Sequence, residues 1–201
     1  MTRFKLTIEY DGSGFVGWQR QENGLSVQQA LEEAIVEFSG QAVTAHGAGR
    51  TDSGVHALGQ VVHIDLDGFP EPETVRDAIN FHLKSAPVAV LTAEAADGDF
   101  HARFSATQRA YLYRIANRRA PLAVDRDRAW WVPTPLDTEA MAAAAGVLLG
   151  RHDFSTFRAA GCQADSPVKT LDTVDVTGDG EHIRVTVRAR SFLYRQVRNI
   201  V

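Results

Sequence analysis

A glycine-rich loop in the first half of the chain constrains the fold more than any other stretch. Residues 47–57 read Gly-Ala-Gly-Arg-Thr-Asp-Ser-Gly-Val-His-Ala and lie between a short apolar run and a clear strand pattern. Glycine accepts positive φ and close backbone approach, so this loop can bend sharply and admit a ligand. If its backbone is extended, the side chains of Arg50 and Asp52 point the same way, and the guanidinium can hold the carboxylate ionised. The carboxylate would then be poised as a nucleophile; the alternative is an exposed ion pair of little energetic value in a surface turn.

Composition limits the class of protein. A chain of 201 residues with 44% hydrophobic content can bury the core of one large domain or two small ones. The sequence has no signal-like start and no long apolar segment, so we expect a soluble, cytoplasmic protein that does not contact a membrane. The single cysteine, Cys162, excludes an intrachain disulfide and a thiolate zinc site, and it is interpreted as a small packing residue.

The charges are unevenly distributed along the chain. Residues 1–100 hold 6 Lys and Arg against 15 Asp and Glu, whereas residues 101–201 hold 15 against 10. Seven arginines fall within 101–131, and five more follow His182 with no acidic residue among them. Arginine-rich stretches suit phosphate recognition, because guanidinium binds phosphate bidentately. The alternative is a solvated basic face.

The first half predicts six elements in a ferredoxin-like order. Residues 3–10 alternate strictly between apolar and polar, which is typical of a half-buried strand. A capping box at Ser26 precedes a helical pattern over 27–38, and short strands follow at 42–46 and 60–66. Pro72 opens a second helix, and an apolar strand covers 87–95. The order is β-α-β-β-α-β, with the glycine-rich loop joining the second and third strands.

The second half predicts a related order. We expect strands over 109–117 and 128–132, a helix over 136–149, a hairpin of strands over 170–177 and 182–190, and a helix that begins at Ser191. Counted from the second of these strands, the order is β-α-β-β-α, which indicates a diverged duplication without its last strand. We therefore expect a protein truncated after Val201 to be less stable and less active than one extended by a closing segment.

Four ordered motifs resemble the tRNA pseudouridine synthases of the TruA type. The segments that carry the resemblance are 49–57 with 60–62, 10–12 through 17–19, 100–106, and 191–194 through 197–200. They occur in the family's order and span essentially the whole chain. After Asn80 the family usually has a leucine-proline-acid turn, where this chain has Phe-His-Leu-Lys-Ser; the difference affects a connection.

The resemblance implies a fold, a reaction and partners. The expected fold is the α+β pseudouridine synthase fold, with two ferredoxin-like (RNP-like) halves, a mixed but mainly antiparallel sheet and helices on one face. Residues 1–100 would form the N-terminal half with the aspartate loop, and residues 101–201 a basic half that is incomplete at its C-terminus. The implied enzyme isomerises uridine to pseudouridine in the tRNA anticodon stem-loop (family positions 38, 39 and 40), acts as a homodimer that shares one tRNA, and uses no metal or organic cofactor.

The resemblance also implies roles for individual residues. Asp52 would be the nucleophile on a base extruded from its stack, with attack at the ribose C1′ or at C6 left open. Arg50 would pair with Asp52, Tyr111 would stack on the target base, and Arg198 would be the basic residue near the aspartate. The implied substrate-binding residues are Thr51, His56, His101, Arg103, Arg114 and Lys169. Without the resemblance, Tyr111 is interpreted as a core aromatic, and the histidines can be ordinary structural ones.

Two further function classes stay open on the sequence. One is a noncatalytic ferredoxin-like RNA-binding module, which would keep the arginines and the aromatic residues Phe15 and Trp18 as a stacking surface without needing Asp52. The same two aromatics can instead pack against the first strand. The other class is a metal-dependent hydrolase that uses Asp52 with Asp65 or a histidine, although no spacing of ligands supports it.

Overall fold

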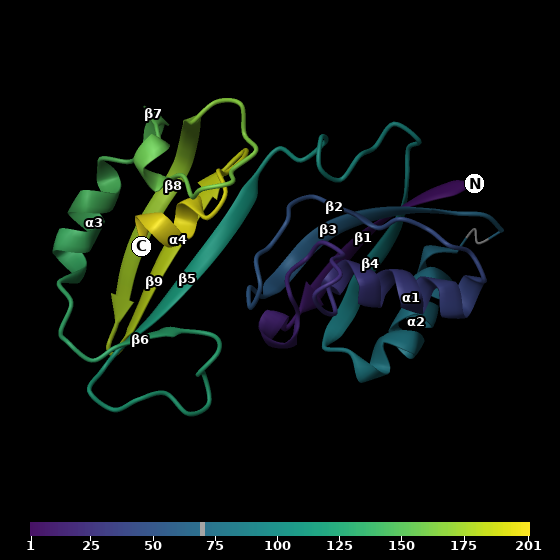
Figure 1. The fold of residues 1–201 in the computed structure, drawn as a ribbon, viewed down its shortest axis with the longest axis horizontal. Helices are drawn as coiled ribbons and strands as arrows, with labels where there is room; N and C mark the ends of the chain where they lie inside the picture. The colour runs from purple at the N-terminus through teal and green to yellow at the C-terminus, as the bar shows by residue number, and fades with distance from the viewer. Residues whose placement is uncertain (69–70) are drawn as a thin grey trace. The chain divides into compact units, whose positions relative to one another are not determined.

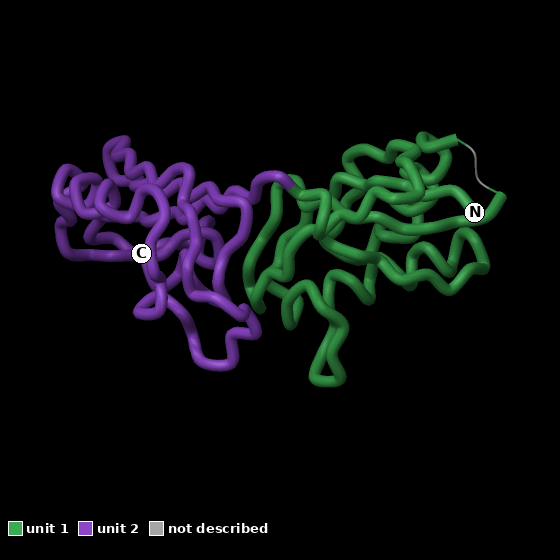
Figure 2. The backbone as a smooth tube through the Cα atoms, turned by 90° about the horizontal axis from the view of Figure 1, so that it is seen from above, with its two compact units in different colours: residues 1–106 green, residues 107–201 purple. Residues whose placement is uncertain are grey.

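The computed structural model describes residues 1–68 and 71–201. The chain divides into two compact units, Met1–Ala106 and Thr107–Val201, which Figure 2 colours separately. We call them unit 1 and unit 2 and describe each by itself.

Unit 1 contains a four-stranded sheet with the order β2-β3-β1-β4. Its strands are β1 (Thr2–Tyr10), β2 (His46–Gly47), β3 (Ala57–Leu66) and β4 (Val88–Ala96). Neighbouring strands are antiparallel, so β1 and β2 run parallel with β3 between them, and β3 and β4 run parallel with β1 between them. This is the split βαβ arrangement of a ferredoxin-like unit, as the order of elements predicts.

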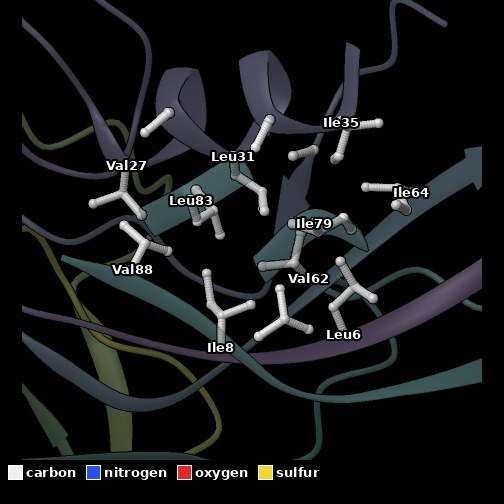
Figure 3. Close-up of a cluster of buried hydrophobic side chains, with 14 of the residues drawn as sticks. Leu6, Ile8, Val27, Leu31, Ile35, Val62, Ile64, Ile79, Leu83 and Val88 are labelled. Atoms are coloured by element: carbon white, nitrogen blue, oxygen red, sulfur yellow. The ribbon is translucent and has the colours of Figure 1, made fainter. Parts of the chain in front are cut away.

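Two helices cover one face of this sheet (Figure 1). Helix α1 (Val27–Ser39) is capped by the Ser26 hydroxyl, which accepts a hydrogen bond from the Gln29 N–H, and it ends at Gly40 with φ 70°. Helix α2 (Pro72–His82) begins at the predicted proline. Figure 3 shows the core between helices and sheet, where Leu31, Ile79 and Ile64 are fully buried. Burial of such side chains is the main force that holds the unit together.

Unit 2 contains a five-stranded sheet with the order β6-β5-β9-β8-β7. Its strands are β5 (Arg109–Asn117), β6 (Trp130–Val132), β7 (Gly150–Asp153), β8 (Val168–Asp179) and β9 (His182–Ala189). Only the β5–β6 pair is parallel. Helices α3 (Thr138–Gly146) and α4 (Gln196–Ile200) supply Ala145 and Val197 to one core with the sheet, so both helices cover the same face. The predicted mixed, mainly antiparallel class is confirmed.

Several predicted boundaries were wrong. Helix α3 begins after its Asp137 cap and ends at Gly146, so the predicted helix over 136–149 was too long at both ends. Residues 191–195 form an irregular strap, and α4 begins only at Gln196. The strand expected over 42–46 is reduced to the two-residue β2, and β7 was missed. Apolar residues inside loops extended the periodic patterns beyond the true ends of the elements.

The predicted starting point of the duplication was also wrong. The order β8-β9-β5 in unit 2 matches β2-β3-β1 in unit 1, so β5, and not β6, occupies the place of β1. Strand β6 is a three-residue edge strand that pairs only with Ile115–Asn117. Its two tryptophans, which are typical strand residues, gave it a longer strand pattern in the sequence.

Candidate active site

The loop that carries Asp52 is held by the segment that follows β1. Asp52 forms an isolated antiparallel bridge with Gly17, and the Trp18 N–H donates to the Thr51 carbonyl over 3.0 Å. The Ser53 hydroxyl donates to the Phe15 carbonyl over 3.1 Å. The aspartate therefore lies in a loop whose backbone is fixed on both sides of it.

Glycines allow this close approach. A Cβ at Gly12 would collide with the Val55 carbonyl group, and a Cβ at Gly17 would lie 2.7 Å from the Thr51 carbonyl oxygen. Gly17 also has φ 120°, which side chains other than that of glycine rarely adopt. Phe15 and Trp18 were expected either to stack on RNA bases or to pack against the first strand. Their side chains are only 3% and 4% exposed, so they pack in the core of unit 1. The packing interpretation of these aromatics is confirmed.

Thr51 lies next to Asp52 and contacts protein. Its hydroxyl oxygen lies 2.9 Å from the hydroxyl of Tyr10, a residue at the end of β1 that is 3% exposed. Arg50 is exposed, and no ion pair within 4.0 Å joins it to Asp52 in the part of the chain that the structure describes. The expected Arg50–Asp52 pair stays a prediction. Asp52 itself is half-buried.

His56 joins the same loop to the Asp11–Gly14 turn. Its Nδ1 accepts a hydrogen bond from the Gly12 N–H over 3.1 Å and lies 3.2 Å from an Asp11 carboxylate oxygen. The Asp11 carboxylate also accepts hydrogen bonds from the Ser13 N–H and hydroxyl. His56 thus ties the two loops together.

His101 belongs to a separate group of rings in unit 1. His63 stacks on His46 with 4.8 Å between ring centroids and meets His101 edge-on at 4.6 Å. His63 is 2% exposed, and burial, followed by the neighbouring imidazoles, lowers its pKa to about 4. Its Nδ1 accepts from the Ala102 N–H, and the His101 Nδ1 accepts from the Arg103 N–H. We call His46, His63 and His101 the histidine stack. It anchors residues 100–105 on the face of β3 opposite the helices.

In unit 2, Tyr111 and Arg114 lie on opposite faces of β5. Tyr111 meets Phe192 edge-on at 5.1 Å and packs, with Tyr113, against the core on the helix-covered side. Arg114 lies on the other face, where its guanidinium contacts the Asp125 carboxylate at 3.0 Å. Alternation along a strand places residues three apart on opposite sides, so the two cannot act on one ligand at the same face. Lys169, on β8, is half-buried and pairs in register with His152 of β7.

The strap over 191–195 positions Arg198. Arg195 has φ 57°, the left-handed region, and no other described residue except glycine has positive φ. The Ala159 N–H donates to the Tyr194 carbonyl over 3.2 Å, and the Tyr194 N–H donates to the side-chain sulfur of Cys162 over 3.3 Å. Arg198 lies exposed on the short α4 that follows.

Sequence reasoning placed Tyr10 and Gly12 in a family motif and His101 among the binding residues, but it missed the Tyr10–Thr51 contact and the stacking of His46 and His63 beside His101. The glycines at 12, 14 and 17 were the available signal for a close backbone approach, whereas nothing in the pattern pairs His46 with His63. The described residues contain no group of three or more His, Cys, Asp or Glu side chains that could hold a metal ion. In the same residues, no helix is long and apolar enough to cross a membrane.

Both units combine helices with a mainly antiparallel sheet, which is consistent with the pseudouridine synthase fold. The family model described as tRNA pseudouridine synthase matches residues 6–105 and 144–201. The chain belongs to this family of RNA-modifying isomerases, which confirms the resemblance and the predicted enzyme class. It is 63% identical over 201 residues to the tRNA pseudouridine synthase A of Paramagnetospirillum magneticum, covering 100% of this chain and 78% of the relative. It is 58% identical to the proteins of that name from Rhodospirillum rubrum and Maricaulis maris, again over 100% of this chain and over 72% and 81% of those relatives.

Proposed function

We propose that this protein converts uridine to pseudouridine in tRNA, with the Asp52 carboxylate as the nucleophile. The observation that carries the proposal is the position of Asp52 in a loop fixed by Gly17, Trp18 and His56, in a chain of the tRNA pseudouridine synthase family. A nucleophile must be held at a fixed distance from the carbon it attacks, and a braced loop provides that. The base first leaves its stack, and Asp52 then attacks the ribose C1′ or C6. The N1–C1′ bond breaks, the base rotates and C5 bonds to C1′; C5 then loses its proton, N1 gains one and the carboxylate is released.

The remaining site residues are proposed in supporting roles. Arg50, exposed next to the aspartate loop, holds the place of the extruded base in the RNA. Tyr111 stacks on the target base, and Arg198 supplies positive charge near the aspartate in the RNA-bound protein. His101 and Arg103 contact the RNA beside the histidine stack, and Lys169 contacts phosphate. The support for these roles is the family resemblance of the motifs in which they lie.

The nucleophile assignment predicts a separation of chemistry from binding. Asp52→Asn and Asp52→Ala should abolish pseudouridine formation, measured by mapping pseudouridine in tRNA after incubation with the protein. The tRNA affinity of both variants should change little, because the carboxylate contributes no favourable contact to phosphate. Asp97→Asn, which removes an exposed carboxylate of the same unit, is the matched control and should retain activity. Turnover near the wild-type rate in the Asp52 variants would disprove the assignment, and equal loss of binding would favour a noncatalytic RNA-binding module.

The finer parts of the function rest on the resemblance alone. We propose that the target uridines lie in the anticodon stem-loop, at family positions 38, 39 and 40, and that the enzyme acts in the cytoplasm as a homodimer that shares one tRNA. Mapping every pseudouridine in a tRNA pool treated with the protein tests the first point. Light scattering of the protein alone and with tRNA tests the second, and a monomer that binds tRNA one to one would overturn it.

A further inference from the structure

One face of the unit 2 sheet has no helix on it. The side chains of Val185 and Val187 on β9 point into the core beneath α3 and α4. The alternate residues of the same strand, His182, Arg184, Thr186 and Arg188, therefore point to the other side of the sheet, and the arginines are exposed. We call this side, with Arg114 of β5, the bare face of unit 2.

The bare face carries an arrangement that sheets normally avoid. Arg114 and Arg184 are register partners on antiparallel strands, which places two positive charges directly opposite each other. Such like-charge pairs destabilise a sheet, since the Cβ atoms of opposite residues lie about 5 Å apart. Asp125 relieves Arg114 through its ion pair at 3.0 Å. In the part of the chain that the structure describes, no carboxylate lies within 4.0 Å of the Arg184 or Arg188 guanidinium, so both charges remain available.

The geometry fits an extended polyanion. Arg184 and Arg188 are four residues apart on one strand, so their Cα atoms lie about 13 Å apart and the two side chains reach different phosphates. The register partners of Thr186, which lies between them, are Leu112 and Asp175. Leu112 is 49% exposed and can contact a ribose or a base edge. Guanidinium groups without protein partners, spaced along a flat surface, suit a phosphate backbone better than a single small anion.

We propose that the bare face of unit 2 is a docking surface for the tRNA backbone, with Arg184 and Arg188 as its phosphate contacts and Arg114 beside them. This deepens the proposed function and rests on it, because tRNA is the occupant only if the protein modifies tRNA. Phosphates bound on this face would neutralise Arg184, the register partner of Arg114 that has no carboxylate of its own among the described residues. The role of this surface differs from that of the aspartate loop: it contributes to tRNA affinity and takes no part in the chemistry.

The test compares salt-dependent tRNA binding of matched variants. Each lost phosphate contact lowers the magnitude of the slope of log Kd against log salt by roughly 0.7 to 0.9. The double variant Arg184→Gln/Arg188→Gln should therefore flatten the slope by about 1.4 to 1.8 and weaken binding at least roughly ten-fold, since charge-assisted hydrogen bonds are lost. The control Arg76→Gln/Lys84→Gln removes two charges from the helix-covered side of unit 1 and should keep the wild-type slope.

A third variant reverses the sign of the effect. Asp175, the register partner of Thr186 on β8, repels phosphate on the same face, so Asp175→Asn should tighten tRNA binding by about two- to five-fold. An unchanged Kd in this variant, or a slope in the double variant equal to that of the control, would overturn the docking surface.

Pseudouridine is mapped with the wild-type protein in parallel. A wild-type protein that forms pseudouridine while the double variant binds tRNA normally refutes only this inference, whereas a wild-type protein that forms none refutes the proposed function. Thermal melting shows whether the double variant folds. If it does not, the Kd of Asp175→Asn alone tests the docking surface.

Discussion

At the scale of single residues, the Asp52 loop contacts a buried side chain at the end of β1. Tyr10 is buried at the end of β1, and its hydroxyl lies 2.9 Å from that of Thr51. Tyr10→Phe removes only that hydroxyl, so it should lower kcat by about three- to ten-fold while leaving KM for tRNA unchanged, because one hydrogen bond is lost from the loop. Rates of pseudouridine formation at saturating and limiting tRNA separate the two constants.

A double-mutant cycle provides the control for this prediction. Thr51→Val deletes the other partner, and the double variant should be no slower than the slower single variant if the two act through one bond. Tyr113→Phe removes a hydroxyl that makes no hydrogen bond in the described part of the chain, and it should leave kcat unchanged. Additive losses in the cycle would show that the Tyr10–Thr51 contact does not position Asp52.

His63 makes stability depend on pH. Its pKa is lowered to about 4 in the folded protein, whereas a histidine in the unfolded chain titrates near 6.5. The unfolded state therefore binds the extra proton between these values, so the free energy of unfolding should fall by up to about 3 kcal/mol as the pH drops from about 6.5 to about 4. Urea denaturation at a series of pH values measures this slope.

A substitution that keeps the acceptor isolates this effect. His63→Asn retains an oxygen that can accept from the Ala102 N–H but does not titrate, so its stability should change less with pH than that of the wild-type protein. His152→Asn removes an exposed histidine and should keep the wild-type slope. Parallel slopes for His63→Asn and the wild-type protein would contradict the assignment.

Sequence reasoning found the residues of the site better than their contacts. The motif around Asp52 and the glycines near it indicated the loop and its close packing, because glycine spacing reflects backbone geometry directly. It missed that Thr51 contacts Tyr10 and that Arg50 lies exposed, because side-chain partners distant in sequence depend on the register of β1 and β3. Alternation along β5 did separate Tyr111 from Arg114, but only the core showed which of the two faces is covered.

At the scale of elements, the helix bounds that were predicted well are those set by capping residues next to the helix in the sequence. Helix α1 has a capping serine at its start and a left-handed glycine at its end, and its predicted bounds were nearly correct. Helix α4 has no side-chain cap and begins after a left-handed arginine, which no sequence rule predicts. The strap before it is held by contacts with residues 159 and 162, and such tertiary contacts are invisible in a periodic pattern.

The contact between the Gly12 turn and the aspartate loop gives an element-scale prediction. Gly12→Ala places a Cβ against the Val55 carbonyl, so the two loops must separate, and activity should fall by at least about ten-fold with a loss of stability of about 1–3 kcal/mol. Gly14→Ala, two residues away, meets no atom within 4 Å, so it should retain full activity. Thermal melts and pseudouridine assays of the two variants make the comparison, and similar behaviour would refute the close approach.

At the scale of the whole molecule, the two units have separate hydrophobic cores. Every buried residue of the first core cluster lies between Phe4 and Val90, and every one of the second lies between Ala145 and Val197. A segment of 1–106 holds a complete core of ordinary domain size, so we expect it to fold alone. It should show a cooperative thermal transition and dispersed amide resonances, and Leu31→Ala should lower its stability by about 2–5 kcal/mol, as in the full chain. A broad, non-cooperative melt of the excised segment would contradict this.

The histidine stack also lies close in sequence to the aspartate loop and to the end of unit 1. The chain leaves this unit at Ala106, immediately after the segment that His101 fixes on His63. The three imidazole rings come from β2, from β3 and from the segment after β4, and β3 starts only five residues after Asp52. Because dispersion contacts weaken steeply with separation, the stack holds this segment on β3 only while the rings stay in contact. We therefore expect a displacement of residues 100–106 to break these ring contacts before it disturbs the strand that follows the aspartate loop.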